Sequence, residues 1–289
     1  MSWLRIVSCL FPVFFCTHAT AESIRTVVYA LPHAQQDPDN NYYVRLLKAA
    51  LEHADGSFEV QSTKEFMVQG RALREIGRGN EVDVSWSMTS PEREEILHAV
   101  PVPIDKGLIG WRVLLVRQPE PLQLQQRNKQ QFRFVQGHDW PDTQILQHNG
   151  LRVETTAEFS SLFAMVSAGR VDAMPRSVLE FEDELQTVAS SLFVAPDVLL
   201  YYPAVQYFFV AKEDKELTFA LEQGLQRVLD NGIFDQLFEQ EFGKTLQWLE
   251  QQHRQVLILE NPWFSLPERV RTLQLLQPLP SHFEHINWQ

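Results

Sequence analysis

The stretch from Asp83 to Val116 constrains the fold of this chain more than any other part of the sequence. An apolar strand ending at Trp86 is followed by a turn that carries Arg93, a proline-rich connector, and a second apolar strand that ends at Val116. This order of elements suits a segment that joins two lobes across a cleft. We therefore expect the rest of the chain to form those two lobes.

The part of the chain before this crossing alternates between strand and helix patterns. Strands are predicted at 24–31, 58–60 and 82–86, and helices at 42–51 and 67–76. Asn40 or Asn41 precedes the first helix as a candidate N-cap. Strand, helix, strand, helix, strand is the order of a doubly wound α/β lobe.

A second α/β set follows the crossing. Strands are predicted at 134–136, 151–153 and 171–173, with helices at 143–147 and from a capping box, Thr155 to Glu158, through Val166. A strand at 205–211 and helices at 215–229 and 233–242 then return the chain to the first lobe. The predicted fold is α/β, with two doubly wound α/β lobes joined by a two-strand hinge.

These elements predict the following division of the chain. Residues 22–105 and 209–245 form the first lobe, residues 106–208 form the second, and a C-terminal extension, residues 246–289, packs on the first lobe as an extended wrap.

The N-terminus has the pattern of a secretory signal peptide. Arg5 precedes an apolar block from Ile6 to Cys16, and Ala19 to Ala21 form a small-residue cleavage site. The apolar block is shorter than the roughly 20 residues that a membrane-spanning helix needs. We expect cleavage after Ala21 and a periplasmic protein.

Composition narrows the kind of protein and partner. The chain has a formal net charge of -12, and both of its cysteines, Cys9 and Cys16, lie in the leader. A cysteine-free mature chain must be stabilised by its apolar core rather than by disulfides. An acidic chain without a basic run is not expected to bind nucleic acid.

Three stretches, in register, resemble one protein family. They are Ser87 to Arg93 (SMTSPER), Gly169 to Ala173 (GRVDA) and Phe208 to Gly243, with its D-N-G-I-F-D piece. The chain is similar in these stretches to the type II periplasmic solute-binding proteins, specifically extracellular family 3, which is best known for binding polar amino acids. The resemblance implies a two-lobed clamp that closes on its ligand by hinge motion.

The resemblance also implies that Arg93 grips the carboxylate of the ligand. A guanidinium offers a planar fork of donors that matches a carboxylate in a bidentate manner. The alternative is a surface arginine that pairs with Glu92, Glu94 or Glu95.

The chain departs from the family pattern at the expected ligand site. Trp86 and Met88 replace the small hydroxyl residues usual before the turn, and Arg176 or Ser177 stands where the family has an aspartate for the ligand's ammonium group. Two arginines without that acid suit an anion better than a zwitterion. Trp86, Ser87, Arg176 and Ser177 join Arg93 as ligand-binding candidates.

The loop from Gly137 to Thr143 lies where the family has a ligand loop, so Gly137, Trp140 and Asp142 are candidates too. Gly137 would allow close approach of the backbone to the ligand, and Trp140 would stack on it. Asp142 would accept from a ligand amine or fix an arginine. The alternatives are core packing for Trp140 and a helix cap for Asp142.

The remaining candidates have weaker signals. Tyr29, Trp111 and Tyr207 are aromatic residues that suit either the cleft walls or the core, and Arg112 suits either a third cationic contact or a surface charge at a strand edge. The acidic run 180–184 is interpreted as a solvated helix face.

The sequence shows no catalytic motif and no metal spacing, and we expect no cofactor and no metal. The favoured function is a monomeric binding protein for a small anionic or zwitterionic solute, with an inner-membrane transporter or sensor as partner. The alternatives are an exported enzyme on the same fold, or an interaction protein without a small ligand. The last alternative is favoured if the cleft is filled by its own Trp and Met side chains.

Overall fold

The structure is a computed structural model that describes residues 23–31, 40–264, 275–278, 282–286 and 288. The predicted leader lies outside the described residues, as does part of the C-terminal extension. In the described part of the chain, no helix combines the length and the apolarity that a membrane span requires.

The first sheet combines strands from residues 25–99 with one strand from much later in the chain, at 206–211. Its order is β2 (Phe58–Phe66), β1 (Arg25–Leu31), β3 (Val84–Met88), β10 (Gln206–Ala211) and β4 (Leu97–Ala99). β1 runs parallel to β2 and β3, and β10 runs antiparallel to β3 and β4. A strand from late in the chain, β10, therefore lies inside this sheet, between β3 and β4.

Four helices pack around the first sheet: α1 (Tyr42–Glu52), α2 (Gln69–Arg78), α3 (Pro91–Ile96) and α7 (Lys215–Asp230). Asn41 is the N-cap of α1, as predicted, because its side chain accepts from the backbone N–H groups of Tyr43 and Val44. The apolar face of α1, with Leu46, Leu47 and Ala50, is fully buried. Burial of such a face supplies most of the stability of a helix this short.

The second sheet has the order β12 (His285–Ile286), β11 (Gln255–Ile258), β9 (Phe193–Tyr201), β5 (Trp111–Val116) and β8 (Met174–Ser177). A separate parallel pair, β6 (Arg133–Gly137) and β7 (Arg152–Thr156), is bridged to Ala173 just before β8. The accompanying helices are α4 (Pro141–His148), α5 (Phe159–Ser167) and α6 (Phe181–Thr187), with short 3-10 turns at Leu108–Gly110 and Leu124–Gln126. Every residue of β5 is buried, which fits a central strand.

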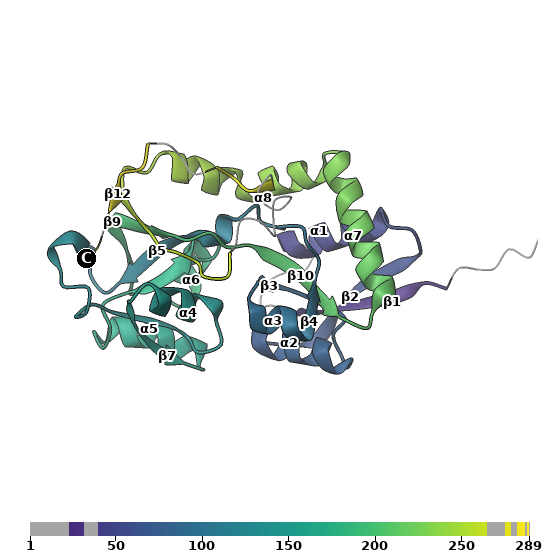
Figure 1. Cartoon of the computed structure of the whole chain (residues 1–289), viewed down its shortest axis with the longest axis horizontal. Helices are drawn as coiled ribbons and strands as arrows, with labels where there is room; N and C mark the ends of the chain where they lie inside the picture. The colour runs from purple at the N-terminus through teal and green to yellow at the C-terminus, as the bar shows by residue number, and fades with distance from the viewer. Residues whose placement is uncertain (1–22, 32–39, 265–274, 279–281, 287, 289) are drawn as a thin grey trace, which may run out of the picture.

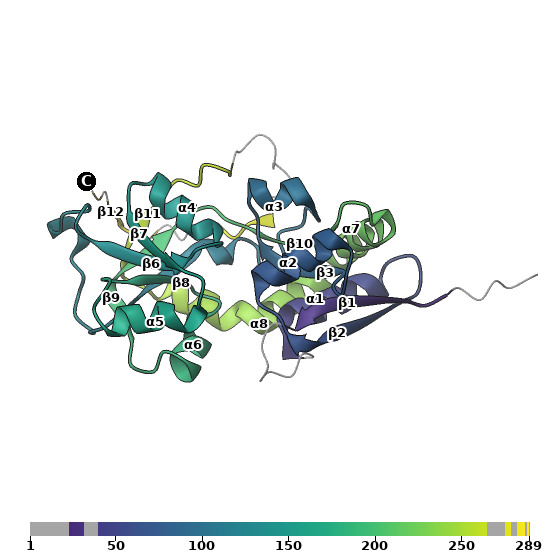
Figure 2. The ribbon, with the colours of Figure 1, turned by 90° about the horizontal axis from the view of Figure 1, so that it is seen from below.

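The chain changes from one sheet to the other at 100–110 and again at 202–205. The two crossing segments lie against each other, since Tyr202 N donates to Gly110 O at 3.2 Å. Figures 1 and 2 show the two groups of elements side by side along the long axis of the molecule. The predicted α/β fold with two lobes is confirmed, and sheet membership puts the second crossing slightly before the expected boundary at 208.

The predicted packing of the C-terminal extension on the first lobe accounts for part of its contacts: Phe264 and Leu276 pack against the first-lobe cluster, but the extension also joins the second lobe. α8 (Ile233–Glu250) extends from the first lobe to the second (Figures 1 and 2), and β11 then pairs with β9 in the second sheet. Trp288 packs among Phe132 and Phe134 of the second lobe. The edge of β9 offers unpaired backbone groups, and the apolar segment Gln255–Ile258 satisfies them.

One local prediction was also wrong. Thr155 and Thr156 belong to β7, and α5 begins only at Phe159, with Glu158 as an N-cap that makes no side-chain hydrogen bond. Pairing of β7 with β6 therefore outweighs the capping box that the sequence suggested.

Candidate functional site

Arg93 lies at the boundary between the lobes because of the local structure around it. Ser90 caps α3, Pro91 is its first residue, and Arg93 is its third. Its Nη1 donates to the Ser87 hydroxyl and, at 2.6 Å, to Met88 O at the end of β3. The guanidinium is thereby aimed along the end of the first sheet toward the second lobe.

The other terminal nitrogen of Arg93 reaches across the boundary. Nη2 donates at 3.3 Å both to Gln69 Oε1, at the start of α2, and to Asp139 O, in the loop after β6. Both distances are long for a hydrogen bond from a charged donor. The contact with Asp139 connects the first lobe to the second.

Burial makes the Arg93 charge costly. The residue is 8% exposed, and desolvation lowers the pKa of Arg93 to about 10, although Asp139, Asp142 and Glu92 act in the opposite direction. Within the described residues, no carboxylate lies within 4 Å of its nitrogens. The alternative of a surface arginine paired with a neighbouring glutamate is therefore wrong.

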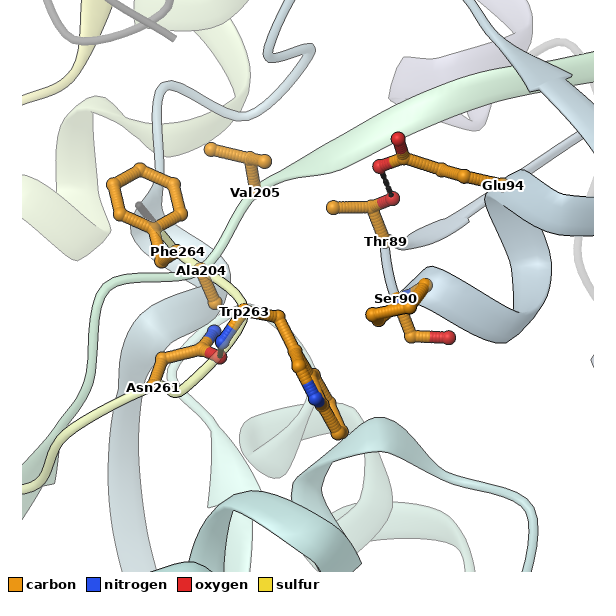
Figure 3. Close-up of a pocket in the computed structure, with 9 residues that line it drawn as sticks. Thr89, Ser90, Glu94, Ala204, Val205, Asn261, Trp263 and Phe264 are labelled. Atoms are coloured by element: carbon orange, nitrogen blue, oxygen red, sulfur yellow. Dashed lines mark hydrogen bonds between the residues drawn. The ribbon is translucent and has the colours of Figure 1, made fainter. Parts of the chain in front are cut away.

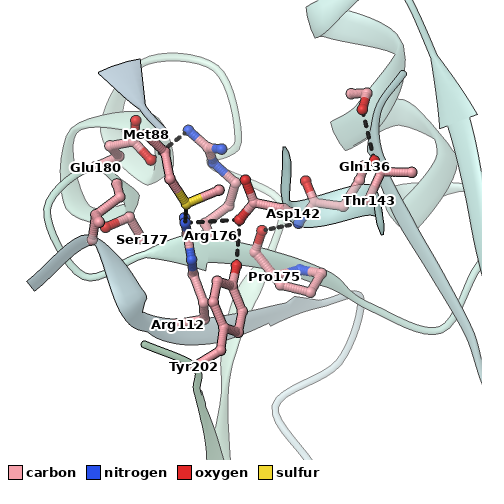
Figure 4. A network of polar contacts seen from close by, with 12 residues as sticks. Met88, Arg112, Gln136, Asp142, Thr143, Pro175, Arg176, Ser177, Glu180 and Tyr202 are labelled. Atoms are coloured by element: carbon pink, nitrogen blue, oxygen red, sulfur yellow. Dashed lines mark hydrogen bonds and ion pairs between the residues drawn. The ribbon is translucent and has the colours of Figure 1, made fainter. Parts of the chain in front are cut away.

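Arg112 is paired inside the second lobe (Figure 4). Its Nη2 lies 2.7 Å from Asp142 Oδ1, and the Tyr202 hydroxyl donates to the same oxygen. Arg112 is 2% exposed, and although burial opposes it, the charge of Asp142 raises the pKa of Arg112. A surface charge at a strand edge was the wrong alternative, because β5 lies between β9 and β8.

The carboxylate of Asp142 is used by the ion pair with Arg112 and the hydrogen bond from Tyr202. It lies in the first turn of α4 but makes no side-chain cap, and it is 6% exposed. Of the predicted roles, fixing an arginine is the one that the structure shows, and the helix-cap alternative is wrong.

Arg176 is paired more fully still. Its Nε lies 2.7 Å from Glu184 Oε2, its Nη2 contacts the other oxygen of Glu184, and Glu180 Oε2 lies 2.9 Å away. Burial opposes protonation, but Glu180 and Glu184 raise the pKa of Arg176 well above its usual range. The bidentate carboxylate that an arginine prefers is thus supplied by the chain itself.

The same ion pair corrects the prediction for residues 180–184. Glu182 and Asp183 are exposed, as a solvated face requires, whereas the Glu184 side chain is only 12% exposed. Glu184 belongs to the interior because it neutralises Arg176.

Trp140 and Gly137 pack against each other in the second lobe. The Trp140 ring lies 4.7 Å from the Arg176 guanidinium and 6.3 Å from the Phe159 ring. A Cβ atom added at Gly137 would lie 2.5 to 2.7 Å from atoms of the Trp140 ring. Gly137 is therefore required by the tryptophan above it, and its predicted contact with a ligand remains a prediction.

The side chain of Met88 fills space between the lobes, whereas the aromatic contacts of Trp86 are with residues of the first lobe. Trp86 stacks on Tyr43 with ring centroids 5.3 Å apart, and Met88 is 6% exposed. Met88 belongs to the first sheet but packs in the apolar cluster of the second lobe, with its Sδ 3.9 Å from Arg112 Nη2. Figure 4 shows the thioether directly over Arg112.

The other candidates are buried and internally bonded. Ser177 is fully buried and accepts from Leu179 N at 3.2 Å. Tyr29, Trp111 and Tyr207 are each at most 3% exposed, which is typical of core positions.

A separate pocket lies next to α3, on its first turn (Figure 3). It has a volume of about 200 Å³ and lies between Thr89, Ser90 and Glu94 of the first lobe and Asn261 and Trp263 of the C-terminal part. In the described part of the chain, no group of histidine, cysteine and acidic side chains has the arrangement of a metal site.

Comparisons with known proteins bear on this geometry. No protein-family model matches the chain, and no curated protein matches its sequence. Solved structures do match. The VFT2 domain of BvgS from Bordetella pertussis has a TM-score of 0.57 at 17% identity, and the alignment covers 75% of this chain and 93% of that domain.

Two further structures are similar to the same degree. A periplasmic His/Glu/Gln/Arg/opine family-binding protein from Silicibacter pomeroyi, in complex with lysine, has a TM-score of 0.56 at 11% identity, with 77% of this chain and 98% of that one covered. A histidine kinase sensor domain similar to periplasmic binding proteins has a TM-score of 0.54 at 15% identity, with 77% and 97% covered.

This chain has the fold of the type II periplasmic binding proteins. The resemblance to family 3 predicted from the three motifs is confirmed at the level of the fold. At these identities, the binding-protein fold says nothing of the ligand.

Several residues that contact Arg93, Arg112, Arg176 or Asp142 were not predicted as part of the site. They are Gln69, Met88, Asp139, Glu184 and Tyr202. Met88 carried a signal, since it is a large apolar residue where the family has a small hydroxyl residue. Gln69, Asp139, Glu184 and Tyr202 make contacts that depend on the tertiary structure, so no local sequence pattern predicts them.

Proposed function

We propose that this chain is an exported solute-binding protein that closes its two lobes on a small carboxylate-bearing solute. The observation that carries the proposal is Arg93, a buried guanidinium at the lobe boundary with no carboxylate within 4 Å in the described chain. Removing a charge from water without a partner is expensive. A ligand carboxylate would supply the missing charge.

The geometry of Arg93 supports this role. Nη1 is held by Ser87 and Met88, which orients the guanidinium, while Nη2 makes only the two long contacts to Gln69 and Asp139. A carboxylate that replaced these contacts would gain shorter, charge-assisted hydrogen bonds. In this proposal, the remaining predicted contacts, Trp86, Ser87, Gly137, Trp140, Asp142, Arg176 and Ser177, shape the cleft around Arg93.

The two crossings at 100–110 and 202–205 are the proposed hinge between the lobes. In the wider proposal, the leader is removed after Ala21 and the protein works as a monomer in the periplasm, by binding rather than catalysis. The similar structures include a lysine complex and a histidine kinase sensor domain, so an inner-membrane transporter or a sensor are both suitable partners.

Ligand-induced thermal stabilisation tests the proposal. A panel of amino acids, dicarboxylates and other small acids should contain at least one that raises the melting temperature of the wild-type protein. Loss of a buried charge pair typically costs at least about 2 kcal/mol, so Arg93→Gln should weaken binding by about 30-fold or more. Arg78→Gln, at an exposed arginine of the same lobe, is the matched control and should bind normally. Unchanged affinity in Arg93→Gln would contradict the assigned role.

A second candidate is an interaction protein with a permanently closed cleft and no small ligand. Met88 favours it, because its side chain already packs in the apolar cluster of the second lobe. Arg112 and Arg176 also have their acids within the chain. This candidate predicts that no acid of the panel stabilises the wild-type protein.

A further inference from the structure

We propose that the cleft selects a carboxylate that carries no ammonium group, and that Met88 is the residue that sets this selection. The inference rests on the proposed function and adds the chemical class of the solute to it. It depends on the ion pairs that the acids of the second lobe already make, and on the side chain that separates these acids from Arg93.

The buried acids of the second lobe are already neutralised. Asp142 binds Arg112 and the Tyr202 hydroxyl, and Glu184 binds Arg176 in a bidentate manner. A ligand ammonium group would have to displace an arginine from one of these acids and leave a buried guanidinium unpaired. A carboxylate without an ammonium group meets no such cost.

Met88 stands between Arg93 and the nearest of these pairs. Its carbonyl oxygen accepts from Arg93 Nη1 at 2.6 Å, while its sulfur lies 3.9 Å from Arg112 Nη2. The side chain is nearly fully buried and apolar, and Figure 4 shows it against Arg112. It therefore separates the anion-binding end of the cleft, at Arg93, from the Arg112 and Asp142 pair. An ammonium group lying against the thioether would lose its water without gaining an acceptor.

Asp139 is the acid whose charge most strongly favours protonated Arg93, and no arginine of the described chain lies within 4 Å of its carboxylate. Its carboxylate lies against Gly70, so closely that a Cβ atom at Gly70 would overlap Oδ2. Gly70 is in the first turn of α2, where the helix dipole favours a negative charge. The Asp139 side chain is 40% exposed, so water weakens its attraction for an ammonium group.

Calorimetric titration with paired probes tests the inference. The pairs are succinate and aspartate, glutarate and glutamate, and propionate and alanine, which differ in the ammonium group. For each pair that binds, the wild-type protein should bind the ammonium-free member at least 10-fold more tightly. Met88→Ala should reduce that ratio at least threefold because it opens the path to Asp142, whereas Met88→Leu, of similar volume, should keep it.

The outcomes separate this inference from the proposed function. Amino acids that bind as tightly as their partners, with Arg93→Gln losing both, would overturn the inference and leave the carboxylate clamp standing. A wild-type ratio that persists in folded Met88→Ala would overturn the role of Met88, and Met88→Ser is the second variant if Met88→Ala fails to fold. Binding of no probe would contradict the clamp and the inference together.

Discussion

Arg93, Arg112 and Arg176 are all buried, yet in the described chain only the last two lie within 4 Å of a carboxylate. The difference comes from their neighbours. Asp142 of α4 pairs with Arg112 of β5, and Glu184 of α6 pairs with Arg176 of β8, whereas the acids that act on Arg93 do so without such an ion pair. Three arginines buried to a similar degree therefore differ: two have a carboxylate partner within the described chain, and for the third, Arg93, we propose a carboxylate of the ligand.

Asp105 is a second buried charge, in the first crossing between the lobes. Its carboxylate is inaccessible to solvent and accepts from the backbone of Gly107 at 3.0 Å and Ile109 at 3.1 Å. Burial raises the pKa of Asp105 to about 6, against the effect of these hydrogen bonds and of Gln206. Between about pH 4 and pH 6, the Asp105 carboxyl is therefore protonated in the folded protein and ionised in the unfolded chain.

This shift has a definite sign for stability. Because the folded state binds the extra proton, the contribution of Asp105 to the free energy of unfolding is full below about pH 4 and is lost as pH rises through about 6. The loss is at most about 3 kcal/mol. Denaturant unfolding at several pH values should show that Asp105→Asn removes this slope, while Asp230→Asn, at an exposed site, leaves it. An unchanged slope in Asp105→Asn would contradict the assignment.

At the level of elements, the sequence predicted the helix starts and ends that capping and turn residues determine locally. The apolar periodicity and Asn41 gave α1, and the stop at Asn231 and Gly232 gave the end of α7. Gly232 has a φ of 81°, a conformation that suits glycine. The turn at Arg93 was predictable for the same reason, since Ser90 and Pro91 determine it locally.

Elements and contacts that depend on distant partners were not predictable in this way. β2 extends to Phe66 because β1 pairs with it, although its sequence beyond Val60 is polar. The short strands β11 and β12 exist only because β9 leaves an edge for them. The pairing of Arg176 with Glu184 likewise depends on how α6 packs, so the sequence alone suggested a ligand contact instead.

For the whole molecule, the C-terminal part is integral to the second lobe. Trp288 is 4% exposed, lies 5.4 Å from the Phe132 ring, and donates from Nε1 to Arg127 O at 2.9 Å. Phe283 contacts Trp111 of β5, with ring centroids 5.1 Å apart. Phe283 and Trp288, both after α8, are therefore part of the apolar core.

A substitution at the end of the chain tests this packing. Trp288→Ala should lower the free energy of unfolding by about 3 to 5 kcal/mol, because it leaves a cavity beside Phe132 and an unpaired Arg127 carbonyl. Trp288→Phe should cost less, since it keeps most of the apolar contact. Chemical denaturation measures both. A loss below about 1 kcal/mol in Trp288→Ala would show that the tail is not part of the core.

The clamp itself is tested most directly by identifying what the protein carries. Wild-type protein and Arg93→Gln, both purified without refolding, are incubated with the panel of small acids, desalted, and weighed as intact complexes by mass spectrometry. The account predicts one small carboxylic acid per wild-type chain and none on Arg93→Gln. The same acid in equal amount on both proteins, or no acid on either, would contradict it.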